Sequence, residues 1–190
     1  QLREELTAQL VEAGVKLVLG SPLAYLPPTD MGTLQPFHVE TASGEGIDAD
    51  IWFLCYGAQT ASGYLRANYG DRLNELGQIA VDEYMRVKDA PGVYDAGDIT
   101  DVPESKRADA ARAHARVVVA NIKAQIAGGE PTTTYQPGKT WIVLPFGIEG
   151  GASQLVTPTG ETQIVGADET AEIKGNDLMV SMVRGQLHLP

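Results

Sequence analysis

Apolar residues recur along the chain at two different spacings, and each spacing predicts a different kind of element. Leu2, Leu6 and Leu10 lie four residues apart, which indicates an amphipathic helix, and Gly14 can end that helix in a left-handed conformation. The same period returns in the Ala-rich stretch 105–129, which ends on two glycines. These two segments are therefore predicted to be helices.

Shorter apolar runs without helical spacing predict strands. Such runs occupy residues 15–20, 77–87 and 92–98, and two more candidates flank a Gly-containing turn between residues 35 and 57. The run 51–56 (IWFLCY) does not alternate with polar residues, which is typical of a strand covered on both faces of a parallel sheet. A strand, a Gly-Asp pair, a loop and a long helix then follow in order, which predicts an α/β fold.

The amino-acid composition of the chain changes near residue 130. A Gly-Gly-Glu-Pro break at 128–131 leads into Thr-, Pro- and Gly-rich turns with short β-like runs. We therefore expect a small α+β C-terminal region over residues 130–190, with the rest of the chain forming the α/β part.

Composition narrows the function classes. The formal net charge of -11 and pI near 4.6 argue against a nucleic-acid or anionic-membrane surface, because such partners select clustered Lys and Arg. Three scattered histidines and one cysteine do not predict a metal cluster. Cys55 stands in the apolar run 51–56, so we expect a buried, inert thiol in a reducing compartment. No apolar stretch approaches the ~18 residues of a membrane span.

The stretch PGVYDAGDITDV (91–102) carries the chemistry that the rest of the chain lacks. Gly97 allows the backbone to pass close to a ligand, and Asp98 stands where the carboxyl ends of parallel strands form a binding crevice. A helix that begins soon afterwards directs free N–H groups toward the same crevice. An Asp after a Gly is also common as a turn or helix cap, so a purely structural role remains the alternative.

Two sets of sequence blocks carry a resemblance to a known family. The order ADIWFLCYG, GQIAVDEYMRV and PGVYDAGDI is similar to the second half of flavoprotein reductases with two dinucleotide-binding domains, the glutathione-reductase-like fold. More narrowly, GDITDVPESKRADAARAHARVVVANI, YQPGKTWIVLPFGIEGGASQ and KGNDLMV resemble the apoptosis-inducing-factor-like flavoproteins of the ferroptosis-suppressor (AMID) type, which are related to type II NADH dehydrogenases. The resemblance extends along almost the whole chain.

The resemblance implies site residues and cofactors. FAD and NAD(P)H would be the cofactors. Asp98 would accept hydrogen bonds from ribityl or ribose-side hydroxyls, and the start of the long helix would lie near the pyrimidine edge of the flavin. No side chain is assigned as a catalytic acid or base, since hydride passes between cofactors. The implied cofactor-binding residues are Gly97, Asp98, Lys106, Arg107, Ala108, Gly57 and Ala58.

Other residues are weighed beside these. Gly57 and Ala58 match the end of the last NAD(P)H-domain strand, although a plain strand exit explains Gly57 equally well. We expect His114, inside an Ala-rich helix, to be packed or solvated rather than functional. Lys174, Asp177 and Met179 match the motif of the region that covers the flavin, but the aromatic residue common at the position of Met179 is missing.

By resemblance, residues 1–72 would complete an NAD(P)H-binding domain, residues 73–129 would return the chain to the FAD domain, and residues 130–190 would form an acceptor-site cap. The fingerprints G-x-G-x-x-G and G-x-x-x-x-G-K-S/T are absent, so we expect the chain to be the C-terminal half of a longer protein and to be poorly soluble or self-associating alone.

The function expected on this basis is electron transfer from NAD(P)H through flavin to a quinone-like or other small acceptor, in a cytoplasmic or peripherally membrane-associated protein. The alternatives are a non-enzymatic remnant or a nucleotide- or partner-binding module without bound flavin.

Overall fold

The computed structural model describes residues 1–57 and 59–189, which divide into two compact units. The first unit contains Gln1–Gly57, Val143–Ser153 and Ile164–Pro190, and the second contains Ala58–Ile142 and Gln154–Gln163. Each unit has buried apolar residues of its own. The domain boundaries expected at residues 72 and 129 stay a prediction.

The first unit begins with the helix that the apolar spacing predicts. Helix α1 spans Leu2–Glu12, and Gly14 follows it with a φ of +78°, donating its N–H to the carbonyl of Val11. Strands β1 (Phe37–Glu40) and β2 (Gly46–Ala49) then form an antiparallel hairpin in which Val39 faces Ile47. Both the helix and a strand pair around a Gly-containing turn are confirmed.

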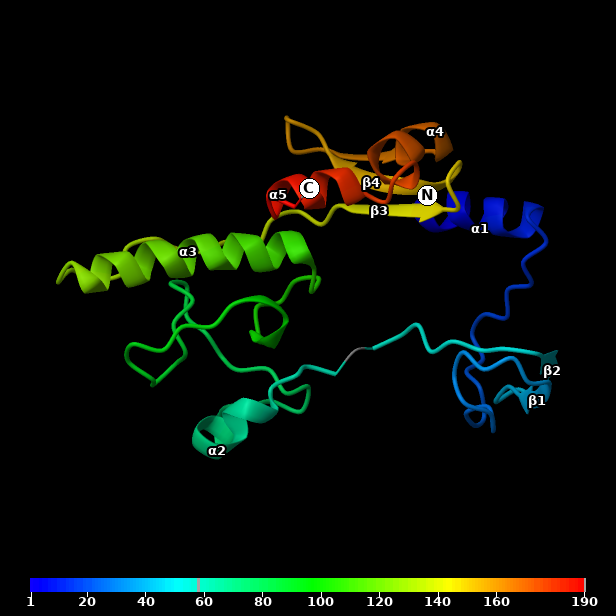
Figure 1. The fold of residues 1–190 in the computed structure, drawn as a ribbon, viewed down its shortest axis with the longest axis horizontal. Helices are drawn as coiled ribbons and strands as arrows, with labels where there is room; N and C mark the ends of the chain where they lie inside the picture. The colour runs from blue at the N-terminus through cyan, green and yellow to red at the C-terminus, as the bar shows by residue number, and fades with distance from the viewer. Residues whose placement is uncertain (58, 190) are drawn as a thin grey trace. The chain divides into compact units, whose positions relative to one another are not determined.

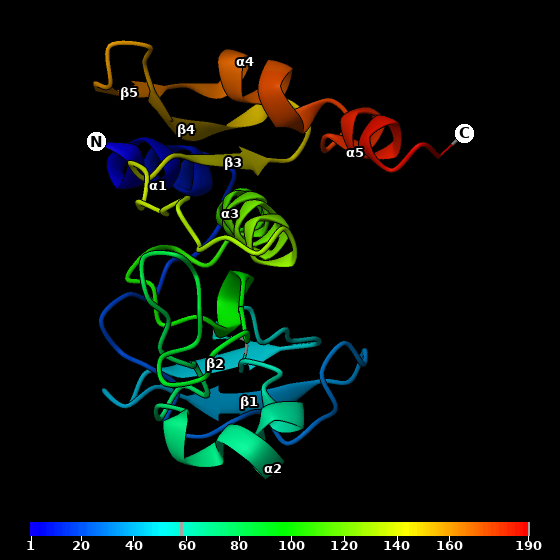
Figure 2. The ribbon, with the colours of Figure 1, turned by 90° about the vertical axis from the view of Figure 1, so that its left-hand side faces the viewer.

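A three-stranded sheet with order β3-β4-β5 lies in the C-terminal part of the chain (Figure 2). Its strands are β3 (Ile142–Phe146), β4 (Gly150–Val156) and β5 (Thr162–Val165). Helix α4 (Ala167–Thr170), the π-helical turn η4 (Ala171–Gly175) and helix α5 (Val180–Gln186) complete it. These strands and short helices all lie beyond residue 130, and the small C-terminal region expected there stays a prediction.

Polar contacts join these pieces within the first unit. The Gln9 side chain of α1 makes two bonds with the backbone of Gly151 in β4: its Oε1 accepts the N–H at 2.7 Å and its Nε2 donates to the carbonyl at 2.9 Å. Both views show α1 beside β3 (Figures 1 and 2). The hydroxyls of Ser153 and Thr170 meet at 2.7 Å, and both residues are fully buried. These bonds satisfy polar groups that burial would otherwise leave unpaired.

The second unit is organised around α3 (Ala108–Ile126), the long helix in Figure 1. Before it come the short helical segments η1 (Gly63–Leu65), α2 (Arg66–Tyr69), η2 (Gly70–Arg72) and η3 (Gly97–Ile99). Val117 of α3 joins a buried apolar cluster whose other members are Ile79, Val81, Met85, Val87 and Ala90. Burial of this face, more than helix propensity, stabilises α3.

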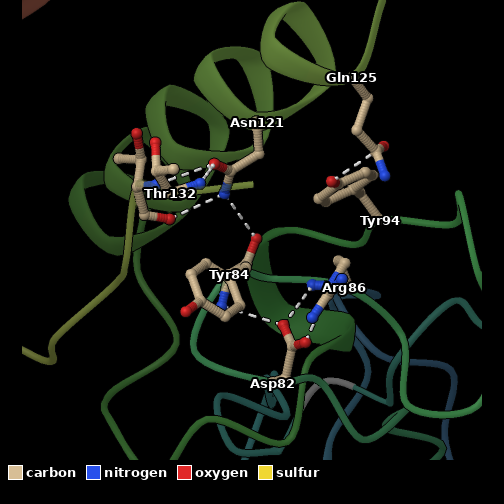
Figure 3. Close-up of polar contacts among 8 residues, drawn as sticks. Asp82, Tyr84, Arg86, Tyr94, Asn121, Gln125 and Thr132 are labelled. Carbon is tan, nitrogen blue, oxygen red and sulfur yellow. Dashed lines mark hydrogen bonds and ion pairs between the residues drawn. The ribbon is translucent and has the colours of Figure 1, made fainter. Parts of the chain in front are cut away.

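Asn121 ties α3 to two separate backbone segments (Figure 3). Its Nδ2 donates to the carbonyls of Tyr84 and Thr133 at 3.0 and 2.7 Å, and its Oδ1 accepts the N–H groups of Thr132 and Thr133 at 3.1 and 3.0 Å. The residue is fully buried, and its two donors and its acceptor oxygen are all in use. One further link, from the Tyr94 hydroxyl to Gln125 at 3.0 Å, lies nearer the end of the helix.

Most of the strands predicted from apolar runs are not formed as strands. Residues 15–20 and 51–56 have no strand assignment, while residues 77–98 contribute isolated bridges such as Ile79 to Thr100, which is parallel. A parallel strand depends on hydrogen bonds to neighbouring strands. Within the described residues, no strand pairs with the segment 51–56.

The prediction for Cys55 is wrong, because the residue is exposed. Ile51, Phe53 and Tyr56 in the same run are exposed as well, with 40%, 65% and 74% of their surface accessible. The thiol was expected to be buried because a sheet was expected to cover it. Separately, none of the helices in the described ranges is long and apolar enough to cross a membrane.

Candidate functional site

The Gly97-Asp98 pair forms a tight turn in front of α3. Ala96 is still extended, with φ of -150° and ψ of 153°, and Gly97 then turns to a φ of +81° to start η3. A Cβ built on Gly97 would lie 3.5 Å from the Cβ of Ala111 in α3. The left-handed conformation, more than the available space, therefore requires glycine here.

Thr100 closes this turn. Its hydroxyl donates to the carbonyl of Gly97 at 2.9 Å, and its backbone N–H donates to the same carbonyl at 3.2 Å. Thr100 is fully buried, so both bonds are shielded from water. The carbonyl side of Gly97 is thus held by the chain itself.

Asp98 is exposed, and no hydrogen bond to its carboxylate is found over residues 1–57 and 59–189. Three other aspartates of the unit differ from it. The carboxylates of Asp82, Asp95 and Asp101 each accept backbone N–H groups, and these hydrogen bonds stabilise the turns around them. Asp98 is therefore free to accept hydrogen bonds from a ligand hydroxyl.

Helix α3 begins immediately after the predicted basic pair. Arg107 is its N-cap, with extended φ and ψ of -144° and 160°, and Ala108 is its first residue. The first N–H groups of a helix have no acceptor within the helix, so this end of α3 presents donors and a partial positive charge. Ala108 has no side chain that would cover them.

Lys106 contacts backbone carbonyls of its own loop, whereas the resemblance implies a place near the flavin. Its ammonium donates to the carbonyls of Thr100 and Val102 at 2.7 and 2.8 Å, so it bridges the loop between η3 and α3. Two of its three N–H donors are thereby in use, and one remains. Its direct role toward a flavin stays a prediction, and its observed role is to hold this loop.

Arg107 lines a cavity of about 280 Å³ at the start of α3. Its guanidinium lies 5.4 Å from the ring centre of Trp141, and one of its terminal nitrogens lies 3.6 Å from the Asp109 carboxylate. Its Nε is buried and has no hydrogen-bond partner in the described part of the chain. Polar and aromatic side chains also face this cavity: Glu104, Asp109, Tyr135, Gln136, Lys139 and Trp141.

A buried polar chain connects the turn to this cavity. His114 of α3, 1% exposed, accepts the N–H of Gly97 at its Nδ1 over 3.0 Å, and its Nε2 lies 2.7 Å from Glu104 Oε1. The other oxygen of Glu104 accepts the hydroxyl of Tyr135 at 2.6 Å. Burial, followed by the hydrogen bond to Glu104, raises the pKa of Tyr135 far above its ordinary value. Tyr135 also stands edge-to-face with the His114 ring, 4.3 Å between centres.

Sequence reasoning missed Glu104 and Tyr135, and it treated His114 as a packed or solvated residue. The structure shows that His114 is packed, and it also shows the three specific partners of that ring. The one local signal was a lone histidine on the buried face of an Ala-rich helix, since such a residue needs polar partners. Nothing in the sequence said which residues those partners were.

The remaining predicted residues lie in the first unit, apart from Ala58, which is outside the described residues. Gly57 has a φ of +59°, which suits a tight exit but identifies no ligand. Lys174 lies in η4. Asp177 accepts the N–H groups of Met179 and Ser181 at 2.8 and 3.1 Å and so holds the turn that leads into α5. Hydrogen bonds from Ser181, then Met179, hold the pKa of Asp177 below its ordinary value.

A comparison with known families shows which family the chain belongs to. Residues 1–115 match the family described as pyridine nucleotide-disulphide oxidoreductase. The chain belongs to this family. The match covers more than half of the 190 residues, including α1, the Gly97-Asp98 turn and the start of α3. It confirms the family expected from the sequence blocks, and with it the cofactor classes FAD and pyridine nucleotide.

Individual relatives point the same way. Ferroptosis suppressor protein 1 of Homo sapiens is 29% identical over 155 residues, which are 81% of this chain and 41% of that protein. FAD-dependent oxidoreductase FVFD30 of Flammulina velutipes is 27% identical over 179 residues, 93% of this chain and 53% of that protein. The chain therefore spans only about half or less of the length of these curated relatives.

The fold has solved counterparts too. LpdA of Mycobacterium tuberculosis superposes with a TM-score of 0.61 at 18% identity, covering 81% of this chain and 31% of that one. At this identity the likeness concerns the fold alone. It agrees with the α/β fold class expected from the sequence.

The observed residues fit a flavin at the Gly97-Asp98 turn. The turn offers a free carboxylate at Asp98 and, just after it, the donor end of α3. The buried, unpartnered Nε of Arg107 adds one unsatisfied donor beside the same helix end. Together these groups can accept from hydroxyls and donate to an electron-rich ring edge.

Proposed function

We propose that this chain contributes the flavin-contacting half of an NAD(P)H-dependent FAD oxidoreductase. The observation that carries the proposal is the free Asp98 carboxylate on the Gly97 turn, placed directly before the N-terminus of α3 in a chain of this family. The finer arrangement, a second half of two dinucleotide-binding domains with a C-terminal cap, belongs to this proposal as well.

Each residue of the turn has a distinct task in this proposal. Asp98 accepts hydrogen bonds from hydroxyls of the ribityl or ribose part of FAD, and Gly97 lets that part approach the backbone. The N–H groups at the start of α3, from Ala108 onward, lie ready to stabilise negative charge on the pyrimidine edge. Lys106 keeps the intervening loop in shape through its two carbonyl contacts.

Bound FAD would supply the hydride and electron chemistry, and the chain would supply binding, orientation and electrostatics. For that reason we assign no side chain here as a general acid or base. Arg107 and Trp141 line the cavity beside α3, at the edge of this region.

The electron acceptor is proposed by its class. A quinone-like or other small acceptor fits a redox protein related to ferroptosis suppressor protein 1, and the C-terminal residues Lys174, Asp177 and Met179 belong to the proposed cap. Met179 stands where the resembled family commonly has an aromatic residue, so the acceptor is proposed by its class alone. We propose a cytoplasmic or peripherally membrane-associated protein, completed by the remaining half of the same polypeptide.

The visible absorption spectrum of the complete protein tests the proposal. We expect a flavin band that bleaches when NADH or NADPH is added without oxygen, and that returns when a quinone is added. A colourless protein that does not bind added FAD would contradict the proposal and would favour a binding module without flavin.

A substitution then tests the residue assignment. Asp98→Ala in the complete protein is expected to weaken FAD binding about tenfold or more, the usual size for a lost hydrogen bond to a charged group. Asp71→Ala is the matched control, because Asp71 is also exposed, lies in the same unit, and has no side-chain bond in residues 59–142. Equal FAD affinity in the two variants would remove Asp98 from the site.

A further inference from the structure

The hydrogen bonds of His114 determine which of its ring nitrogens carries the proton. The backbone N–H of Gly97 can only donate, so Nδ1, 3.0 Å away, must accept with its lone pair. The proton of the neutral ring is then on Nε2 and is donated to Glu104 Oε1 at 2.7 Å. The ring is 1% exposed, and this pair of contacts leaves it one orientation.

Glu104 and Tyr135 hold that ring in place. Glu104 Oε2 accepts the Tyr135 hydroxyl at 2.6 Å, so both oxygens of the carboxylate are engaged by the network. The Tyr135 and His114 rings pack edge-to-face, with 4.3 Å between their centres. Glu104 fixes the Nε2 side of the imidazole. Because the ring is rigid, this contact also fixes the direction of Nδ1.

Nδ1 of His114 accepts the N–H of the peptide group between residues 96 and 97. Gly97 has its carbonyl held by Thr100 and its N–H held by His114, so both of its polar groups are restrained. At a φ of +81° a glycine would otherwise have wide freedom, because no Cβ limits it. His114 thus holds the peptide between residues 96 and 97, and Thr100 holds the one between residues 97 and 98. With both peptides held, the φ and ψ of Gly97 are restrained, and these angles set the direction in which Asp98 leaves the turn.

We propose that His114 is a positioning residue for cofactor binding, acting through its Nδ1 on the Gly97 N–H and thereby on Asp98. This inference rests on the proposed function, since it assumes that Asp98 binds a hydroxyl-bearing cofactor. His114 itself touches neither cofactor nor acceptor. Its ring determines how the Gly97-Asp98 turn is presented to the ligand.

Two amide substitutions separate the two nitrogens of the ring. In His114→Asn the amide oxygen can take the place of Nδ1 and still accept from Gly97, but the contact with Glu104 is lost. In His114→Gln the longer amide reaches the place of Nε2 and keeps Glu104, but the acceptor for Gly97 is lost. Both variants lose one hydrogen bond, so a merely structural role predicts similar effects for both.

The measurement is the FAD dissociation constant of the complete protein, with thermal unfolding as the control. We expect His114→Gln to weaken FAD binding about tenfold and His114→Asn to weaken it less than about threefold, the range seen when an outer partner of a ligand site is removed. Asp71→Ala, which lies outside this network, should leave FAD affinity close to wild type. Equal losses for the Asn and Gln variants would overturn the positioning role.

Two further observations keep the outcomes apart. If the wild-type protein binds no FAD, the proposed function fails and the inference fails with it, whereas FAD binding that is insensitive to His114 overturns the inference alone. Nitrogen NMR of the wild-type ring needs no variant to fold. It should show Nδ1 unprotonated and Nε2 protonated at neutral pH, and a proton on Nδ1 would contradict the proposal.

Discussion

Two apolar runs of this chain end on a left-handed glycine, and the structure treats them differently. Residues 92–97 end at Gly97, whose N–H and carbonyl are both bound by side chains of the same unit. Residues 51–57 end at Gly57, where Ile51, Phe53 and Tyr56 are exposed and no Cβ at the glycine would meet an atom within 4 Å. The two runs look alike as sequence and differ in what surrounds them.

The difference shows what holds a binding turn. The Gly97 turn needs few strand neighbours, because a helix that follows it within about a dozen residues supplies His114, and the loop supplies Glu104 and Lys106. The run 51–56 was expected to depend on the parallel strands beside it. Local side-chain partners can therefore preserve a site where sheet pairing is slight.

Asn121→Ala should have the largest effect on the unfolding free energy, and it acts in the unit that contains the Gly97 turn. The change leaves the N–H groups of Thr132 and Thr133 and the carbonyls of Tyr84 and Thr133 without their partner. We expect a loss of about 2 to 3 kcal/mol of unfolding free energy, below the sum of four bonds because water reaches the exposed threonines. Urea denaturation measures it, and Asn68→Ala, an exposed asparagine of the same unit, is the control that should change little.

Gly97→Ala and Gly57→Ala form a matched pair that tests the comparison itself. A left-handed alanine costs about 1 to 2 kcal/mol where the turn cannot relax, and Gly97 is held from both sides. We expect that cost at Gly97, together with weaker FAD binding, and a smaller one at Gly57, whose exposed segment can change conformation. Equal losses in urea denaturation would show that residues 51–57 are as tightly held as the Gly97 turn.

Asp95→Asn should alter how stability depends on pH. Burial raises the pKa of Asp95, two residues before Gly97, so ionising it disfavours the folded state. The contribution of the acid is present below its unfolded pKa of about 3.9 and is lost as pH rises through the higher folded value. At pH 7 we expect the Asn variant to be slightly more stable, and the gain to vanish below about pH 4. Melting temperatures across this range measure the gain, and one that grows on acidification would contradict it.

Labelling of Cys55 should have the smallest effect on the protein, and it tests only the exposed residues 51–56. In the 190-residue chain the thiol is exposed, so a maleimide should modify it almost as fast as it modifies a free cysteine peptide. Slow labelling that becomes fast in urea would mean that the run 51–56 is covered after all. The fold of the rest should not change on labelling.

The predictable part of the fold consists of features with a local cause. Helix α1, helix α3 and the glycines that end them follow from apolar spacing and backbone freedom, and both helices are present. The expected strands at 15–20 and 51–56 were wrong as assignments, because pairing depends on residues distant in sequence. The buried thiol expected at Cys55 was wrong for the same reason.

The candidate site divides in the same way. Gly97 and Asp98 could be found from sequence, because a glycine and a short acid at a strand exit have a recognisable chemistry. Glu104 and Tyr135 could not, since a Glu in a loop and a Tyr after a helix carry no mark of a shared partner. The cofactor roles of Gly57, Lys106, Arg107 and Ala108 stay predictions, with Lys106 engaged by loop carbonyls in the structure.

By itself, the sequence determined the family, the helix periods and the position of the turn, since these depend on residue types at short separations. Only the tertiary structure decided that His114 accepts the Gly97 N–H, that Glu104 and Tyr135 orient its ring, and that Asn121 joins α3 to two backbone segments. The physical reason is that a buried polar side chain must find partners in space. Many positions in a sequence can supply them, and packing selects one set.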